Sequence, residues 1–242
     1  TCTVMPRTYY QYIYFIHIYN THNESYYILH KMNNLILVRH GQSRWNLERR
    51  FTGFYDVDLT SLGKSEAKYA GQLIKELEIE FNAYFTSELK RAINSLKIIL
   101  EVLNNPNVKI NKSWRLNERH YGDLTGFNKD EIKKTHGSEQ VKIWRRSFDI
   151  PPPLMKTDHP YKNKINSSIL GESLKDTFER VMPYFNQKIK PLILSDKNIL
   201  IVFHGNSCRA LLMKILNISK NNIINFEIPT GNPLLKIGRA HV

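Results

Sequence analysis

Apolar and polar residues follow two periods along this chain, one typical of buried strands and one of amphipathic helices. Short apolar runs predict strands at 35–38, 83–85 and 199–203. Apolar residues spaced three and four apart predict helices over 61–77 and 89–103. Strands that alternate with helices are typical of an α/β fold built on a parallel sheet.

The second half of the chain contains a long irregular stretch before this alternation resumes. Residues 123–160 form an excursion, in which 128–135 and 138–146 predict two short helices. A third long helix is expected to start at about Ser173, and Pro183 should kink or break it. A long ordered loop of this kind is usually functional.

Shorter segments carry weaker patterns. Residues 44–53 mix polar and aromatic side chains without a stable period, which predicts a loop. Residues 108–110 and 114–116 predict strand pieces that lead into a polar cluster at 117–122.

Both ends of the chain differ in composition from its body. Residues 1–31 are rich in Tyr, Ile and His, which fits either a targeting leader or translated sequence upstream of a start at Met32. We favour the second interpretation, because no small-residue cleavage site follows. Residues 237–242 resemble a non-native tail. We therefore expect a disordered extension at 1–31 and one catalytic domain at 32–236.

The composition is that of a globular protein with one domain. The chain has 242 residues, of which 41% are hydrophobic and 24% charged, and it holds no apolar run long enough to span a bilayer. Its two cysteines exclude a disulfide framework and favour a reducing compartment, which indicates a cytoplasmic location.

The charge balance points to an anionic partner. The formal net charge is +13, spread over the chain without a dense Lys/Arg tract. This distribution favours a small anionic substrate over nucleic acid.

Two predicted strands end in the same pair of residue types. Arg39, His40 and Gly41 follow the first strand, and His204-Gly205-Asn206-Ser207 follows the strand at 199–203. Open α/β sheets bind ligands just outside the carboxyl ends of their strands. Gly41 allows a sharp turn, and a helix capped by Asn206 or Ser207 would present free N–H groups to an anion. We expect both histidines at one edge of the sheet.

Two further residues have a functional and a structural interpretation. Arg91 falls in the first turn of a predicted helix, where a cation is not favoured, so it either meets a ligand or is simply solvated. Glu118 is either a proton-transfer group or a partner in a structural ion pair. Together with Arg39, His40 and His204, they would form a cationic pocket suited to phosphoryl transfer.

The excursion adds cations whose role the charge pattern leaves open between an anion clamp and a solvated face. These residues are Lys129, Lys133, Lys134, Lys142, Arg145 and Arg146. No Cys/His cluster has metal-binding spacing, and neither a P-loop nor a dinucleotide-binding glycine motif is present.

Motifs spread over most of the chain carry a family resemblance. In order, they are Arg39-His40-Gly41-Gln42-Ser43 with Asn46, Phe51-Thr52-Gly53, Leu89-Lys90-Arg91-Ala92, Asn117-Glu118-Arg119-His120-Tyr121-Gly122, Trp144-Arg145-Arg146, Pro151-Pro152-Pro153, Gly171-Glu172-Ser173-Leu174 and His204-Gly205-Asn206-Ser207. From about Leu35 to about Leu235 the chain resembles the cofactor-dependent phosphoglycerate mutases of the histidine phosphatase superfamily.

The resemblance implies a fold and an activity. The fold is a three-layer α/β/α sandwich with a mostly parallel central sheet. The activity is the glycolytic and gluconeogenic interconversion of 2-phosphoglycerate and 3-phosphoglycerate, primed by the cofactor 2,3-bisphosphoglycerate without a metal. The implied partner is a small phosphorylated substrate, with neither nucleic acid nor membrane, and the implied assembly is a homodimer or homotetramer.

The resemblance also implies a role for each matched residue. His40 would become phosphorylated, Glu118 would donate and accept the proton, and His204 would stabilise the transferring phosphoryl group. Arg39 and Arg91 would clamp that group. Further substrate-binding positions would be Asn46, Thr52, Gly53, Arg119, His120, Tyr121, Lys129, Arg145, Arg146, Gly205 and Asn206.

Alternatives of the same superfamily are a histidine phosphatase with water as acceptor, or a bisphosphoglycerate mutase or phosphatase. A mutase must also hold the far end of its substrate, and Lys129, Arg145 and Arg146 give a reason to prefer it. A basic binding protein on this scaffold has only the net charge in its favour. The chain departs from the family at Arg44, an extra cation, and in lacking a tail past Leu235 that helps to close the site. Without that tail we expect weak mutase activity relative to hydrolysis.

Overall fold

In the described part of the chain, the centre of the molecule is a twisted sheet of six strands in the order β1-β6-β2-β5-β3-β4. The computed structural model describes residues 14–16 and 34–237. Neighbouring strands are parallel except for β6, which runs antiparallel to β2. The strands are β1 (Tyr14–Ile16), β2 (Asn34–Arg39), β3 (Ala83–Thr86), β4 (Ile110–Lys112), β5 (Ile199–Phe203) and β6 (Pro233–Ile237).

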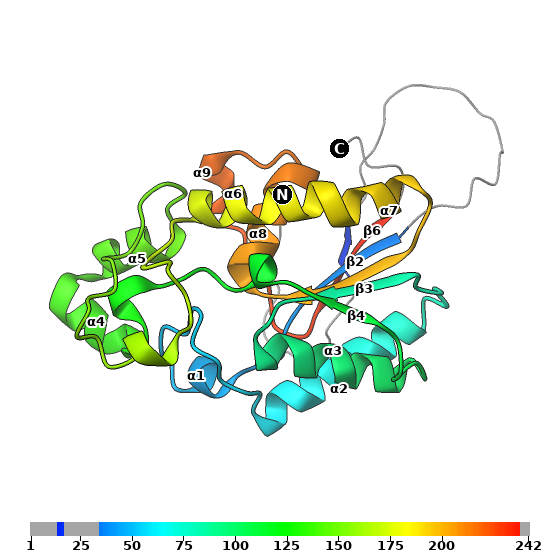
Figure 1. Cartoon of the computed structure of the whole chain (residues 1–242), viewed down its shortest axis with the longest axis horizontal. Coiled ribbons are helices and arrows are strands. Elements are labelled where there is room, and N and C mark those ends of the chain that lie inside the picture. The colour runs from blue at the N-terminus through cyan, green and yellow to red at the C-terminus, as the bar shows by residue number, and fades with distance from the viewer. Residues whose placement is uncertain (1–13, 17–33, 238–242) are drawn as a thin grey trace.

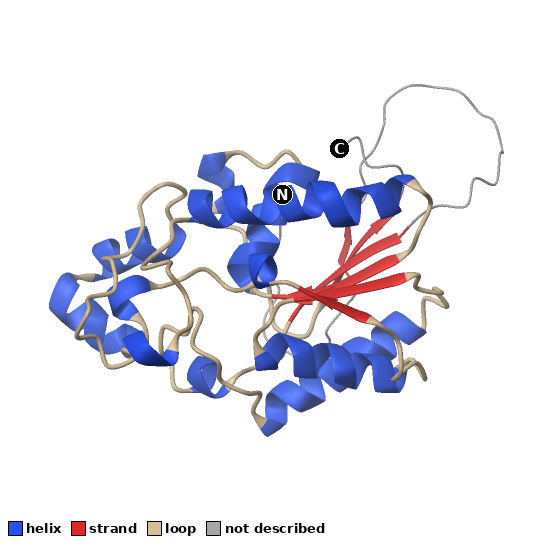
Figure 2. Ribbon diagram, in the orientation of Figure 1, coloured by secondary structure: helices blue, strands red, loops and turns tan. Residues whose placement is uncertain are grey.

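Helices cover both faces of this sheet. α2 and α3 lie on one side, and α6, α7 and α8 on the other (Figures 1 and 2). The α-helices are α1 (Arg44–Leu47), α2 (Ser61–Lys75), α3 (Lys90–Val102), α4 (Lys129–His136), α5 (Ser138–Arg146), α6 (Leu174–Tyr184), α7 (Lys190–Leu194), α8 (Gly205–Ile215) and α9 (Lys220–Ile223). The expected three-layer α/β/α sandwich is confirmed.

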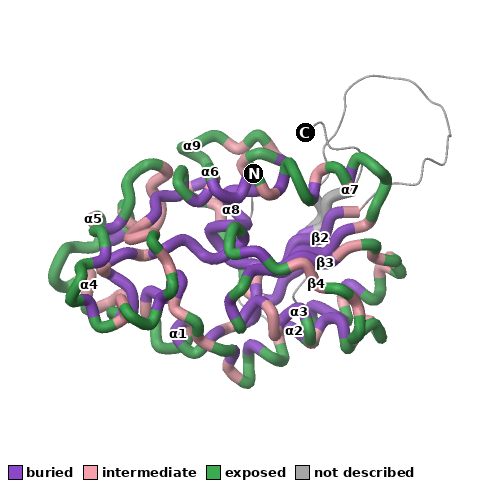
Figure 3. The backbone as a smooth tube through the Cα atoms, viewed as in Figure 1, coloured by how far each residue is buried: buried purple, intermediate pink, exposed green. Residues whose placement is uncertain are grey.

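The core follows from the alternation of side chains along the strands. Leu35 and Leu37 of β2 pack toward α6 and α8, whereas Ile36 and Val38 pack toward α2 and α3. Both faces of β2 and β5 are therefore buried, as Figure 3 shows. This explains why these strands read as unbroken apolar runs.

The excursion folds as a small lobe beyond the carboxyl ends of β2 and β5. It carries α4 and α5, which lie away from the sheet (Figure 1). Its own small core contains Phe51, Leu124 and Val141. The helices expected at 128–135 and 138–146 are confirmed with shifts of at most one residue.

Three local expectations were wrong. The loop expected at 44–53 begins with the helical turn α1, because Ser43 Oγ accepts the N–H of Asn46 at 3.3 Å and Asn46 Oδ1 accepts the N–H of Ser43 at 3.1 Å. The strand piece expected at 114–116 is a 3₁₀ turn that Ser113 caps. The strand near 108–110 begins only at Ile110.

Pro183 breaks the third long helix as expected. It lies within the last turn of α6, and a π-helical turn over Phe185–Ile189 follows before α7 begins at Lys190. A proline lacks the N–H that would donate the next hydrogen bond of the helix, and a local change of helix type accommodates the missing bond.

The expectations for the chain ends fall mostly outside the described residues. Residues 1–31 are described only at Tyr14–Ile16, which pair with β6, and of 237–242 only Ile237 is described. No helix in the described ranges is long and apolar enough to cross a membrane.

Gly41 brings the loop after β2 directly against the start of α2. A Cβ atom on Gly41 would lie 2.0 Å from the carbonyl oxygen of Gly63. We expect Gly41→Ala to lower the free energy of unfolding by about 3 kcal/mol, because neither backbone can move without disturbing β2 or α2. Urea denaturation measures this loss.

The matched control is Gly171→Ala, whose Cβ would meet the end of the flexible Leu154 side chain at 3.1 Å. It should cost less than about 1 kcal/mol. Equal midpoints for the two variants would contradict the close-approach argument.

Candidate active site

The two strand-end histidines lie side by side. β2 and β5 are parallel neighbours, with Arg39 opposite Phe203, so the next residue of each strand is a histidine at the same edge. The rings of His40 and His204 are 4.9 Å apart between centroids. The expectation that they share one edge of the sheet is confirmed.

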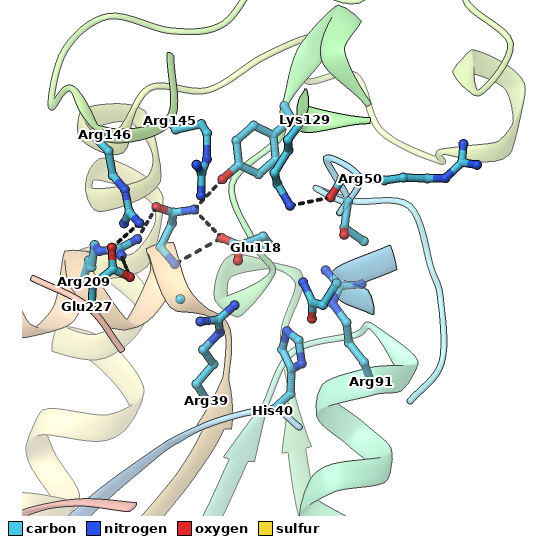
Figure 4. Close-up of a pocket in the computed structure, with 15 residues that line it drawn as sticks. Arg39, His40, Arg50, Arg91, Glu118, Lys129, Arg145, Arg146, Arg209 and Glu227 are labelled. Atoms are coloured by element: carbon cyan, nitrogen blue, oxygen red, sulfur yellow. Dashed lines mark hydrogen bonds and ion pairs between the residues drawn. The ribbon is translucent and has the colours of Figure 1, made fainter. Parts of the chain in front are cut away.

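A pocket opens above these histidines, between the sheet edge and the α4/α5 lobe (Figure 4). Twelve residues singled out from the sequence line it. They are Arg39, His40, Asn46, Thr52, Arg91, Glu118, Tyr121, Lys129, Arg145, Arg146, Gly205 and Asn206. Residues from opposite ends of the domain thus meet in one cationic cavity.

Four other residues singled out from the sequence lie behind the pocket wall. His204 is fully buried beneath the lining. The carbonyl of Gly53 accepts Nη2 of Arg91 at 2.8 Å. Arg119 donates to the carbonyls of Trp144 and Arg145, and so holds the end of α5.

His120 is the fourth of these residues, and it is a structural histidine here. It is fully buried, its Nδ1 accepts the N–H of Gly122 at 2.9 Å, and its ring packs against Phe54. Burial, with Lys162 and Arg180 nearby, lowers the pKa of His120 to about 4. A neutral, enclosed ring of this kind supports the wall and does not reach a ligand in the pocket.

The backbone fixes the tautomer of His40. Nδ1 lies 2.6 Å from the carbonyl oxygen of Gly41, and because a carbonyl can only accept, Nδ1 carries the proton. The lone pair is therefore on Nε2. Burial, then the charges of Arg91 and Arg39, hold the pKa of His40 well below its usual value. The ring is neutral at physiological pH and can act as a nitrogen nucleophile.

His204 is held from its far side. Its Nε2 lies 2.8 Å from Ser87 Oγ, while its buried Nδ1 has no protein partner among the described residues. Burial, then Arg91 and His40, lower its pKa well below the usual value. The His204 ring, which lies beside His40, therefore has one nitrogen, Nδ1, without a hydrogen bond among the described residues.

Arg91 is buried, which excludes the alternative of a solvated arginine. The residue is 1% exposed, and Nη1 donates to the carbonyl of Tyr55 at 3.1 Å. Burial lowers its pKa to about 10, despite the opposing effect of Glu118, so it remains charged at neutral pH. Arg39 donates Nη1 to the carbonyl of Ile228 at 2.7 Å, and its buried Nε has no partner within the part of the chain that the structure describes.

The carboxylate of Glu118 is asymmetric. Its Oε1 accepts three N–H groups, from the backbone of Arg119 at 2.8 Å and from the backbone and side chain of Asn206 at 3.1 and 2.9 Å. Burial alone would raise the pKa of Glu118, but these donors and the charges of Arg91 and Arg39 bring it below its usual value. Oε2 has no such partner among the described residues, and the carboxylate is ionised. A fixed, ionised carboxylate with one free oxygen can exchange a proton with a ligand hydroxyl.

A buried ion pair places Glu118 from behind. Arg180 binds Glu172 at 2.6 Å and also donates Nη2 to the carbonyl of Glu118 at 3.0 Å. Glu172 in turn accepts the backbone N–H of His120 at 2.8 Å. The segment 117–120 is therefore anchored to α6 by charge-assisted hydrogen bonds.

Some cations of the excursion line the pocket and others lie outside it. Lys129, Arg145 and Arg146 line the pocket, whereas Lys133 and Lys142 line a neighbouring recess behind Arg146. Lys129 donates to the carbonyl of Arg50 at 2.7 Å, and burial lowers its pKa to about 8. Three of the six cations singled out in the excursion therefore line this pocket.

Sequence reasoning missed Arg50, Arg209 and Glu227 as lining residues. Arg209 lies three residues after Asn206, hence on the same face of α8, which was a usable signal. Its Nη1 donates to Asn206 Oδ1 at 3.1 Å and so fixes the amide that faces Glu118. Glu227 lies in the loop between α9 and β6, where no periodicity marks it.

The donor set of the pocket suits a polyanion. Seven cationic side chains and two carboxylates line it, and the neutral lining groups Asn46, Thr52 and Asn206 add hydrogen-bonding capacity. Within the described ranges, no group of three or more His, Cys, Asp or Glu residues is placed to hold a metal ion.

Comparison with known proteins agrees with this geometry. The family model of the histidine phosphatase superfamily (branch 1) matches residues 35–234. The 2,3-bisphosphoglycerate-dependent phosphoglycerate mutase of Hydrogenobaculum sp. (strain Y04AAS1) is 49% identical over 215 residues, which cover 85% of this chain and 87% of that protein. The protein of the same name from Erythrobacter litoralis is 50% identical over 210 residues, covering 84% and 92%.

Solved structures share the fold at lower identity. A mycobacterial glucosyl-3-phosphoglycerate phosphatase matches with a TM-score of 0.67 and 22% identity, over 87% of this chain and 98% of that one. Bacillus stearothermophilus YhfR matches with a TM-score of 0.65 and 22% identity, over 87% and 96%. These likenesses concern the arrangement of the sheet and its helices.

Proposed function

The chain belongs to the histidine phosphatase superfamily (branch 1), and we propose that it is a phosphoglycerate mutase that works through a phosphohistidine on His40. It interconverts 2-phosphoglycerate and 3-phosphoglycerate. The observation that carries the proposal is the second set of cations, Lys129, Arg145 and Arg146, which line the same pocket as the histidine. A phosphatase needs one phosphate clamp, whereas a mutase must hold both ends of its ligand.

The pocket fits 2,3-bisphosphoglycerate, the cofactor named for the relatives. That molecule carries two phosphates and a carboxylate. Among the described residues, Nε of Arg39 and Oε2 of Glu118 have no hydrogen-bond partner, so they offer a donor and an acceptor to such a ligand. Arg39 and Arg91 would hold the phosphate beside His40, and Arg145 and Arg146 the far end. When bound, the cofactor supplies the phosphoryl group that His40 then carries.

The residues perform the transfer in two balanced steps. Starting from phosphorylated His40, the ionised Glu118 removes the proton from the attacking hydroxyl while the new P–O bond forms and the N–P bond breaks. In the second step, His40 Nε2 donates its lone pair to phosphorus while a P–O bond breaks, and Glu118 returns that proton to the leaving oxygen. Arg39, Arg91 and His204 surround the transferring group, where charge on its oxygens needs cationic and N–H donors.

A coupled assay tests this function. Formation of 2-phosphoglycerate from 3-phosphoglycerate is measured with enolase as the coupling enzyme, with and without added 2,3-bisphosphoglycerate. Strong dependence on the bisphosphate supports the mutase. Release of inorganic phosphate without isomerisation would identify a phosphatase, and the absence of both reactions would contradict an enzymatic role.

The pH profile gives a prediction for the distal end of the pocket. Because burial lowers the pKa of Lys129 to about 8, this cation is charged below that pH and neutral above it. We expect kcat/KM for 3-phosphoglycerate to fall as the pH rises through about 8. In Lys129→Arg the guanidinium stays charged, so the decline should move to higher pH.

Tyr121 is the competing group. Burial raises its pKa, but Arg119 and the other cations outweigh this and bring the pKa to about 8. If the decline persists in Lys129→Arg and disappears in Tyr121→Phe, the tyrosine sets it and the prediction for Lys129 is wrong.

Three properties of the whole protein belong to the same proposal. The catalytic domain spans 32–236, the protein works in the cytoplasm, and it assembles as a homodimer or homotetramer. The resemblance to the family supports the assembly, and the two cysteines support the location. Size-exclusion chromatography with light scattering measures the assembly directly.

A further inference from the structure

Glu227 forms the side wall of the pocket at its distal end, and its carboxylate bridges two arginines. It pairs with Nη2 of Arg146, and its other oxygen lies 3.4 Å from Nη2 of Arg209 (Figure 4). Both arginines line the pocket. A carboxylate of the protein therefore pairs with two of the cations that line the pocket.

The backbone on both sides of Glu227 is held by hydrogen bonds, while its side chain is exposed. The carbonyl of Phe226 accepts Nε of Arg209 at 2.7 Å, and the carbonyl of Ile228 accepts Nη1 of Arg39 at 2.7 Å. The Glu227 side chain is 68% exposed, whereas that of Arg209 is 8% exposed. The carboxylate can leave the arginines by side-chain rotation alone, without moving the loop.

A second recess lies on the other side of this pair. Arg145, Arg146 and Glu227 line both cavities, and the recess adds Lys133 and Lys142. A carboxylate that rotates away from Arg146 would thus remain in a cationic surrounding, which lowers the cost of its displacement. The Arg146–Glu227 pair thus lies between the two cavities.

We propose that Glu227 is an exchangeable counter-ion, which the distal anionic group of the ligand displaces from Arg146. This inference rests on the proposed function, since it concerns how a doubly phosphorylated ligand is held and released at that site. By occupying Arg146, Glu227 weakens the binding of the most highly charged ligand and speeds its release. A ligand with one phosphate brings less charge to the distal end and meets less competition.

Glu227→Gln tests the counter-ion role by direct binding. Isothermal titration calorimetry should show the affinity for 2,3-bisphosphoglycerate rising about fivefold, with a smaller gain for 3-phosphoglycerate. In the coupled assay, half-maximal activation should need correspondingly less 2,3-bisphosphoglycerate. Glu139→Gln is the matched control, because Glu139 is an exposed residue that lines the recess but pairs with neither arginine among the described contacts. It should change these values by less than twofold.

A double-mutant cycle distinguishes competition of Glu227 with the ligand for Arg146 from orientation of Arg146 by Glu227. The gain from Glu227→Gln should disappear in an Arg146→Gln background, because the cation for which ligand and carboxylate compete is gone. Unchanged affinity in Glu227→Gln would overturn the inference, and reduced affinity would show instead that Glu227 orients Arg146 for binding.

Inorganic pyrophosphate is titrated alongside, as a two-phosphate anion that carries no glycerate. If wild-type protein neither binds nor isomerises phosphoglycerates, the proposed function has failed. The pyrophosphate titration still tests whether Glu227 acts as a counter-ion. A pyrophosphate affinity that is the same in wild type and Glu227→Gln would in that case overturn it.

Discussion

His40→Ala is expected to remove phosphoryl transfer, with a loss of about 10,000-fold or more in kcat/KM. The loss is large because the imidazole supplies both the lone pair that attacks phosphorus and the atom that carries the phosphoryl group. The neighbouring ring of His204 does not replace it, because it is fully buried beneath the pocket lining. Incubation with labelled 2,3-bisphosphoglycerate, followed by acid treatment, measures the acid-labile label on the protein, which should be absent from the variant.

His136→Ala is the matched control for this experiment. His136 is an exposed histidine at the end of α4 that does not line the pocket. It should retain both label and activity. Circular dichroism should show that His40→Ala keeps its secondary structure, because the removed ring lies at the floor of an open pocket. Label retained in His40→Ala would contradict the nucleophile assignment.

The fold could be predicted to the extent that local patterns determine it. The run 35–38 and the run 199–203 are apolar throughout, because both faces of β2 and β5 are covered by helices. Strand pairing itself was not readable from one sequence. That β5 lies directly beside β2, with residues 40–198 between them, was not predicted. Only the expectation that both strands end at one edge followed from the rule for open sheets.

The elements that prediction missed are those whose shape depends on side-chain hydrogen bonds. The turn α1 exists because Ser43 and Asn46 cap each other, and the 3₁₀ turn at 114–116 because Ser113 accepts the N–H of Arg115 at 3.3 Å. Neither contact alters hydrophobic periodicity. The apolar residues of the 3₁₀ turn, such as Leu116, are as compatible with a strand as with a tight helical turn.

The site was predictable where motifs are local and was missed where they are not. His40 and Asn206 stand in short polar clusters directly after strands, and Glu118 stands in the polar cluster 117–122. Glu227 is brought to the pocket by the loop before β6, and only the fold shows that its carboxylate meets Arg146. Conversely, His120 sits in a dense cluster but turns away from the pocket, so density alone overestimates the number of ligand contacts.

Glu118→Gln is expected to lower kcat for phosphoglycerate isomerisation by about 1,000-fold while leaving the fold intact. The amide oxygen can take the position of Oε1 and accept the same three N–H groups, from Arg119 and Asn206. The amide nitrogen at the Oε2 position neither accepts the hydroxyl proton nor returns it. The coupled assay measures the loss, and thermal unfolding should show a change of less than about 1 kcal/mol in stability.

The leaving group distinguishes a proton-transfer role from a structural one. p-Nitrophenyl phosphate has a leaving phenolate that needs no proton, so its transfer to His40 does not require an acid. Glu118→Gln should therefore form phosphohistidine from this ester at a rate within about tenfold of wild type, although it fails with phosphoglycerates. His40→Ala should fail with both substrates. If Glu118→Gln lost both reactions equally, the carboxylate would be serving to hold Asn206 and the arginines in place, because a misplaced phosphate clamp impairs every phosphate ester alike.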